Sequence, residues 1–82
     1  MANTLGSVLP SRTLASDEAL RIARADAETA YHDLNPYRIE IMLEADGWHI
    51  AYEPKDATLN GAGPHYVIDA ATGAIVSKKY YQ

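Results

Sequence analysis

The chain has 82 residues, is 48% hydrophobic and 22% charged, contains no cysteine and carries a formal net charge of −4. This length accommodates one small domain, and the ordinary apolar fraction argues against global disorder. The lack of cysteine excludes disulfides, zinc–thiolate sites and thiol nucleophiles. Because the seven basic residues are scattered along an acidic chain, no nucleic-acid partner is expected.

The first part of the chain carries no periodic pattern. Residues 1–15 are interrupted by Gly6 and Pro10, so we predict a flexible N-terminal arm followed by a single domain over residues 16–82. The arm side chains expected to dock on the domain are Val8, Leu9 and Leu14. The arm lacks the basic start and apolar run of a signal peptide, and no apolar run reaches the length of a membrane span. We therefore expect a cytoplasmic protein with no membrane contact.

A helix is predicted from Ser16 to the Asn35-Pro36 step. Ser16 is a good N-cap, and Asp17 and Glu18 place negative charge on the first turn, where the helix dipole favours it. The residue before a proline is disfavoured in a helix, which sets the expected end. Apolar residues recur at helical spacing and form one stripe, which consists of Leu20, Ala23, Ala27, Ala30, Tyr31 and Leu34. A stripe made mostly of alanine allows close packing on a sheet.

From Tyr37 the apolar period changes to two, which is typical of a strand with one buried face. The expected buried residues of this strand are Ile39, Ile41 and Leu43. Asp46-Gly47 predicts a tight hairpin turn, and a return strand follows until Pro54. The residues expected on one face of the return strand are Trp48, Ile50 and Tyr52, with Trp48 packed in the core against Ala23 and Ala27.

The rest of the chain predicts a second hairpin. Residues 54–64 form a long loop rich in turn formers, residues 66–68 a short apolar strand and residues 69–73 a turn, and a last strand starts at Ile75. The order of elements is therefore one helix followed by four strands. It predicts an α+β fold in which the N-terminal helix packs on a four-stranded antiparallel sheet.

No strong catalytic motif is present, so neither an enzyme nor a bound cofactor or metal is expected. His49 and His65 fall on neighbouring predicted strands, and His49 shares its face with Glu53. If the register matched, these three side chains could ligate a metal, but solvent-facing strand residues are the preferred interpretation. Glu40 and Glu53 could form an acid–base pair across the first hairpin, and ordinary carboxylates on a solvated sheet face are again preferred.

A surface for a protein partner is the remaining candidate site. The exposed face of the first hairpin mixes charged and apolar side chains, a glycine-rich stretch follows that hairpin, and tyrosines are typical of interfaces. The candidate partner-binding residues are Arg38, Glu40, Met42, His49, Glu53, Gly61, Gly63 and Tyr81.

Three segments together resemble known families. They are residues 19–23 of the helix, Asp46-Gly47-Trp48 of the hairpin, and residues 61–76, which read GAGPHYVIDAATGAIV. They resemble the small bacterial NTF2-fold immunity proteins and, more loosely, the PepSY domain, and the similarity extends over residues 17–79. A single predicted helix and the short length depart from a full NTF2-like fold, and the missing export signal departs from PepSY proteins.

The resemblance implies two functions. An immunity protein is cytoplasmic and binds and neutralises a cognate bacterial toxin without catalysis. A PepSY domain is a secreted or membrane-linked module that inhibits peptidases, with a two-layer sandwich similar to cystatin. We therefore expect a non-enzymatic protein-binding module of immunity type. The alternatives are a PepSY-like peptidase-inhibitory or regulatory domain, and a self-associating protein that forms a homodimer.

Overall fold

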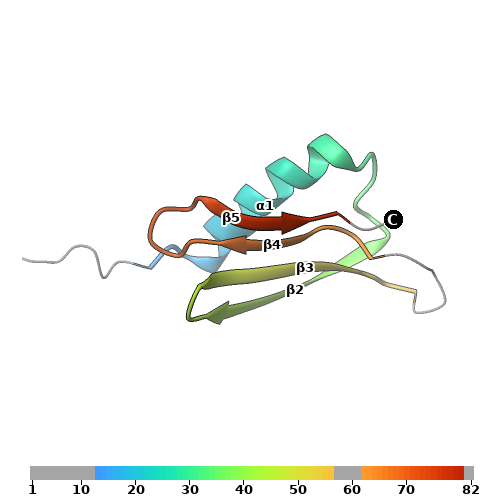
Figure 1. Ribbon diagram of the computed structural model, residues 1–82. Helices are drawn as coiled ribbons and strands as arrows, with labels where there is room; N and C mark the ends of the chain where they lie inside the picture. Colours follow the sequence, from blue (N-terminus) through green and yellow to red (C-terminus); the bar gives the residue numbers. More distant parts are fainter. Residues whose placement is uncertain (1–12, 57–61, 81–82) are drawn as a thin grey trace, which may run out of the picture.

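The computed structural model describes residues 13–56 and 62–80. One helix is followed by four strands in a single antiparallel sheet, with the order β2-β3-β4-β5 (Figure 1). The elements are α1 (Ser16–Ala30), β2 (Tyr37–Glu44), β3 (Gly47–Pro54), β4 (His65–Ile68) and β5 (Ile75–Lys79). The predicted α+β fold, one helix packed on a four-stranded antiparallel sheet, is confirmed. Expectations for Val8, Leu9, Gly61 and Tyr81 fall outside the described residues.

The start of α1 is held by the chain that precedes it. The Leu14 N–H donates to the carbonyl of Ala70 at 2.6 Å, and the Trp48 indole N–H donates to the Leu14 carbonyl at 2.9 Å. Ala15 occupies the N-cap position in an extended conformation, with no side-chain cap. Ser16 is therefore the first helical residue, and its predicted capping role is wrong. Leu14 docks on the core as expected, and Trp48 is only partly buried.

The helix ends at Ala30, several residues before the predicted stop. Tyr31 leaves the helical region with φ −126° and ψ 132°. Its ring packs edge-on against the rings of Tyr37 and Tyr80, with centroids 6.0 Å apart in both pairs. These aromatic contacts stabilise the extended conformation at this position, so tertiary packing ends the helix before the proline at position 36. Over the described part of the chain, no helix is long and apolar enough to cross a bilayer.

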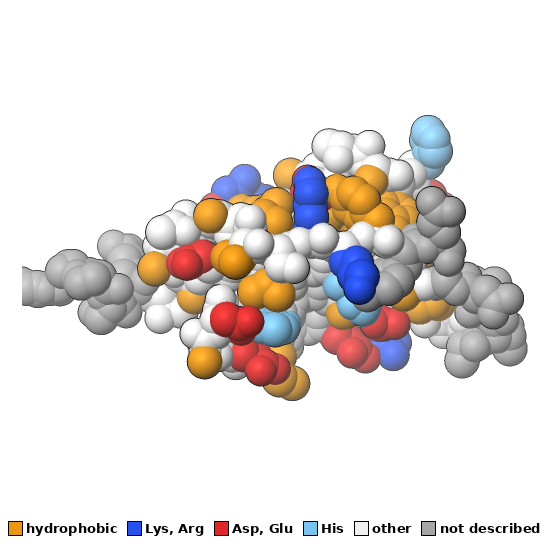
Figure 2. All heavy atoms as spheres, in the orientation of Figure 1, with side chains coloured by type: hydrophobic (Ala, Val, Ile, Leu, Met, Phe, Trp, Pro, Cys, Tyr) orange, Lys and Arg blue, Asp and Glu red, His pale blue; other side chains and the backbone are white. Residues whose placement is uncertain are grey.

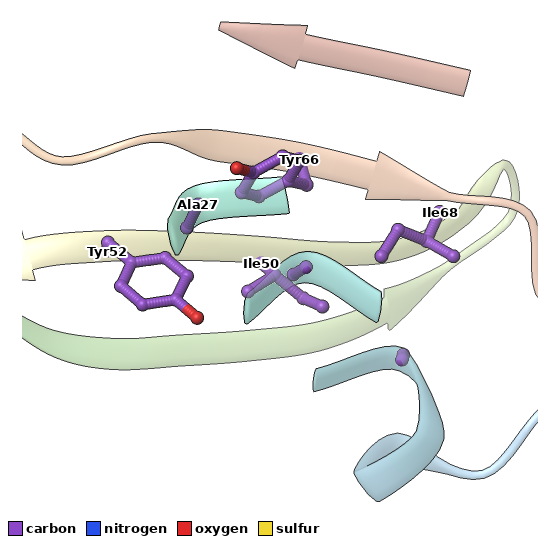
Figure 3. Close-up of a cluster of buried hydrophobic side chains, with 7 residues drawn as sticks. Ala27, Ile50, Tyr52, Tyr66 and Ile68 are labelled. Carbon is purple, nitrogen blue, oxygen red and sulfur yellow. The ribbon is translucent and has the colours of Figure 1, made fainter. Parts of the chain in front are cut away.

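The core lies between α1 and the two central strands (Figure 3). On α1 the buried residues are Ala19, Ala23 and Ala27, and on β3 and β4 they are Ile50, Tyr52, Tyr66 and Ile68. Alanine side chains let the helix backbone approach the sheet closely, and the large β-strand side chains then fill the space between the layers. The predicted alanine stripe is thus confirmed at Ala23 and Ala27, whereas Ala30 is exposed and Ala19 takes its place.

Each hairpin closes through a turn that the sequence predicts. Glu44 pairs with Gly47 across the first turn, and Gly47 has the positive φ (+132°) that few residues other than glycine tolerate. In the second turn, the Asp69 carboxylate accepts hydrogen bonds from the N–H groups of Ala71 at 2.7 Å and Thr72 at 3.0 Å. Local side-chain bonds of this kind stabilise a turn, which confirms the interpretation of both segments.

Strand β2 differs from its prediction. Ile41 is partly buried against the core, but Ile39 and Leu43 are 46% and 48% exposed. The reason is that the single helix is narrower than the four-stranded sheet. It packs mainly on β3 and β4 and leaves this side of β2 largely uncovered. The apolar alternation therefore identified the correct side of β2, but no second helix is present in the described residues to bury it.

Candidate functional site

The sheet has one side without a helix, which we call the open face. Successive side chains of a strand point to opposite sides, and β3 and β4 alternate between buried residues under α1 and partly exposed residues on the other side. The open face consists of Arg38, Glu40, Met42 and Glu44 from β2, His49, Ala51 and Glu53 from β3, His65 and Val67 from β4, and Ser77 and Lys79 from β5. None of these side chains is buried.

A shallow hollow of about 410 Å³ lies on the open face. Its apolar lining comes from Met42, Ala51 and Val67 at the middle of the sheet. Carboxylates of β2 line it on one side, and Lys79 of β5 lines it on the other. Figure 2 shows acidic side chains gathered over the β2 and β3 part of this view, with histidine side chains beside them. The hollow thus combines an apolar centre with a charged margin.

The strand register brings most of the predicted partner-binding residues together. Arg38 lies opposite Glu53, and Met42 lies opposite His49, while Glu40 occupies the position between them on the same face. Gly63 does not share this location. It is buried, and a Cβ built there would lie 2.8 Å from the Cβ of Tyr52, so Gly63 allows close packing against Tyr52 and is not part of an exposed binding loop.

The two histidines have separate carboxylate partners. His65 Nε2 lies 3.0 Å from an oxygen of Glu53, and His49 Nε2 lies 2.6 Å from Asp46 Oδ1. The hydrogen bond to His49 lowers the pKa of Asp46 below its usual value. His49 is placed opposite Val67, two register positions away from the pair of Ala51 with His65. The three-ligand arrangement of His49, His65 and Glu53 is therefore not formed, and the described residues hold no group of three or more such side chains that could bind a metal ion.

The two carboxylates weighed as an acid–base pair also have different partners. Glu40 forms an exposed ion pair with Arg38, whereas Glu53 contacts His65 on the neighbouring strand. The ion pair raises the pKa of Arg38. Both glutamates belong to the open face, but each carboxylate is engaged with a cationic or histidine side chain. Their arrangement gives the open face alternating charge.

A second polar cluster lies on the helix side and was not predicted. Asp26 of α1 accepts hydrogen bonds from the hydroxyls of Tyr66 at 2.9 Å and Tyr80 at 2.5 Å, and from Lys78 Nζ at 3.1 Å. We call these four residues the Asp26 cluster. The bond from Tyr80 contributes most to lowering the pKa of Asp26, with further lowering from Tyr66 and Lys78 and an opposing effect of burial. Burial and the bond to Asp26 raise the pKa of Tyr66.

The Asp26 cluster connects α1 to β4 and to the end of β5, so its evident role is to position the helix on the sheet. The sequence contained two usable signals for it. Asp26 immediately precedes Ala27 in the alanine stripe, so a carboxylate had to lie at the margin of the core. The chain also has six tyrosines and no phenylalanine. Every aromatic residue other than the single tryptophan therefore carries a hydroxyl that can donate a hydrogen bond to a carboxylate.

Neither a family model, nor a curated protein, nor a solved structure matches the chain.

Proposed function

We propose that the chain is a small protein-binding module that acts without catalysis and binds its partner on the open face. The observation that carries this proposal is the burial pattern of the sheet. On the helix side Ile50, Tyr52 and Tyr66 are buried, whereas no described side chain of the open face is. Met42 is 61% exposed there, beside the hollow and its charged margin. An apolar centre with a polar margin is the usual composition of a protein interface.

The charges of the open face favour a partner with a basic contact surface. Three glutamates of the open face, Glu40, Glu44 and Glu53, outnumber its two basic residues, Arg38 and Lys79. The whole chain carries a net charge of −4. Complementary charges at an interface margin mainly increase the rate of association and the selectivity for the partner. Binding is therefore expected to weaken as salt concentration rises.

Among proteins with a basic surface, we favour a bacterial toxin that the chain neutralises in the cytoplasm, as an immunity protein does. Support for this choice comes from the sequence resemblance of residues 61–76. The open, single-helix fold suits an inhibitor that covers a surface of its target more than a protein that encloses a small ligand.

A PepSY-like peptidase inhibitor is the alternative function. It would bind an extended peptidase segment along an exposed strand edge, and the edge of β2 pairs with no other described strand. The two functions use different surfaces. Substitutions on the open face would therefore weaken binding of a toxin and leave edge-mediated peptidase inhibition unchanged.

The test begins with affinity purification of the tagged full chain from its host and identification of the bound protein by mass spectrometry. The affinity of the purified partner is then measured for the parent chain and for Glu40→Lys and Glu53→Lys. We expect each variant to weaken binding by about tenfold. The matched control is Glu28→Lys, which reverses an exposed charge on α1 and is expected to leave the affinity unchanged.

Circular dichroism establishes that each variant is folded before its affinity is compared. Equal losses in all three variants would indicate a general charge effect and contradict a site on the open face. Unchanged affinity in Glu40→Lys and Glu53→Lys would place the partner elsewhere. A captured protein with peptidase activity that the chain inhibits would favour the alternative.

A further inference from the structure

The outer edge of β2 has backbone groups available for another strand. The Tyr52 N–H donates to the Pro64 carbonyl at 3.1 Å, and the Gly63 N–H donates to the Tyr52 carbonyl at 2.9 Å. The backbone of Tyr52 is thus directed towards the side of β4. In an antiparallel ladder, successive residues direct these groups to alternate sides, so Ala51 and Glu53 face β2.

The same alternation identifies the free groups on β2. Glu40 pairs with Ala51, and Arg38 pairs with Glu53, so the even-numbered residues of β2 face β3. The N–H and C=O groups of Ile39, Ile41 and Leu43 are then directed to the outer edge. No described strand pairs with that edge, which lies at one side of the sheet in Figure 1.

The side chains of β2 favour pairing of this edge with another strand. Ile39 and Leu43 are apolar and nearly half exposed, on the side where α1 packs mainly on β3 and β4. Natural proteins protect such edges with charged side chains, lysine above all, with proline or with a bulge. The charged side chains of β2 lie on the open face and leave its helix side apolar. Between Tyr37 and Glu44 there is no lysine or proline, and the register with β3 is regular.

The opposite edge of the sheet is protected. Strand β5 ends in Lys78 and Lys79, and its register with β4 is irregular between Val67 and Ile68. Both features oppose the addition of a further strand. The two edges of one small sheet therefore differ, and β2 is the edge suited to pairing.

Charge complementarity selects a second copy of this chain as the occupant. Suppose that two β2 strands pair antiparallel so that Ile41 lies opposite Ile41 of the second copy. The numbers of any two residues that lie opposite each other then add up to 82. Ile39 then lies opposite Leu43 of the second copy, and Arg38 lies opposite Glu44 of the second copy. Each contact occurs twice because the symmetry repeats it. Apolar pairs form on the helix side, whereas on the open face Arg38 pairs with the opposite charge of Glu44 and Glu40 lies opposite the uncharged Met42.

The neighbouring registers are less favourable. Pairing about Glu40 places two copies of Glu40 opposite each other, and pairing about Met42 places Glu40 opposite Glu44 of the second copy. Like charges directly opposite one another destabilise a sheet. Pairing about Ile41 is the register of these three that avoids them.

We propose that the chain forms a symmetric homodimer through antiparallel pairing of two β2 strands centred on Ile41, which joins two sheets into one of eight strands. The pairing places both helices on one side and both open faces on the other. It buries Ile39 and Leu43 of both copies, which a small domain with a limited core otherwise leaves in water. The dimer does not depend on which partner binds the open face.

The mass of the full chain is measured by sedimentation velocity over a dilution series, with no partner present. We expect a species of twice the 9.0 kDa chain mass that dissociates on dilution. Leu43→Lys places a lysine on the pairing edge and is expected to give monomers. The matched control is Val76→Lys on the opposite edge, a position that is 61% exposed, and it should dimerise like the parent.

The register is tested by charge exchange. Arg38→Glu alone and Glu44→Arg alone each place like charges opposite one another twice, and each should raise the dimer dissociation constant roughly tenfold. The double variant restores opposite charges and should recover the parent affinity. Circular dichroism verifies that the variants are folded.

Each result decides the proposal. A parent chain that stays monomeric at all concentrations overturns it, as does a dimer that Val76→Lys disrupts and Leu43→Lys does not. A double variant that stays as weak as the single variants overturns the register. Because no partner protein is used, failure here leaves the open-face experiment unaffected, and the reverse also holds.

Discussion

The carboxylate of Asp26 in α1 accepts a hydrogen bond from the hydroxyl of Tyr66 in β4, 2.9 Å away and 40 residues later in the chain. Tyr80 and Lys78 donate to the same carboxylate. Because the fully buried side chains of α1 are all alanines, these polar bonds help to fix the position of the helix along the strands. Bonds to a charged acceptor are stronger than neutral ones.

Replacement of Asp26 is expected to destabilise the fold. Asp26→Asn removes the charge that three donors share, and the free energy of unfolding should fall by about 2 kcal/mol in urea titrations at neutral pH. The matched control is Asp33→Asn. Asp33 is exposed and accepts a bond only from the nearby Asn35 N–H among the bonds described, which an asparagine can also accept. Equal stability of Asp26→Asn and the parent would contradict the structural role of the cluster.

The same residue is expected to contribute to acid unfolding. The pKa of Asp26 is lowered in the folded state, whereas in the unfolded chain it lies at about 3.9. The unfolded state therefore binds the proton more readily, so the stabilisation is present above about pH 4 and is lost as the pH falls through the folded pKa. The difference in stability between the parent and Asp26→Asn should accordingly shrink below pH 4. A constant difference down to pH 2 would contradict this linkage.

Two buried tyrosines should respond oppositely to loss of their hydroxyls. Tyr52 is 2% exposed, and its hydroxyl has no hydrogen-bond partner among the described residues, whereas the Tyr66 hydroxyl donates to Asp26. Removing an unsatisfied buried polar group is neutral or stabilising. Tyr52→Phe should therefore leave the free energy of unfolding unchanged or raise it by up to about 1 kcal/mol, and Tyr66→Phe should lower it by about 1 to 2 kcal/mol. Similar losses in both variants would show that Tyr52 has a partner.

Gly47 of the first hairpin is expected to tolerate substitution less well than Gly73 of the second hairpin. A Cβ at Gly47 would lie 2.3 Å from the backbone oxygen of Ile68, and the φ of +132° is unfavourable for alanine. Gly47→Ala should cost about 3 kcal/mol, measured by thermal and urea unfolding. Gly73→Ala is the comparison, since φ is +80° there but the new Cβ meets only the flexible end of Ile22 at 3.2 Å and of Leu14 at 3.8 Å. Its cost should be about 1 kcal/mol, and a reversed order would contradict the clash.

Part of the candidate site was predictable because strand alternation is a local property. The pattern from Arg38 to Glu44 and the turn at Asp46-Gly47 together set which side chains share a face. Arg38, Glu40, Met42, His49 and Glu53 were therefore assigned to one surface. The pairing of individual side chains was not predictable, because the contact of His65 with Glu53 depends on the register of β3 and β4, and the contact of His49 with Asp46 depends on the geometry of the turn.

The sequence by itself determined the order of the elements, the two turns and the alanine-lined side of the helix, since each depends on neighbouring residues and on periodicity. Only the tertiary structure decided where α1 ends, because contacts of Tyr31 with Tyr37 and Tyr80 outweigh the local preference to continue the helix. It also decided that Ile39 and Leu43 remain exposed, because the single helix packs mainly on the two central strands. Contacts between residues distant in the chain depend on how the layers are placed, and no local pattern encodes that placement.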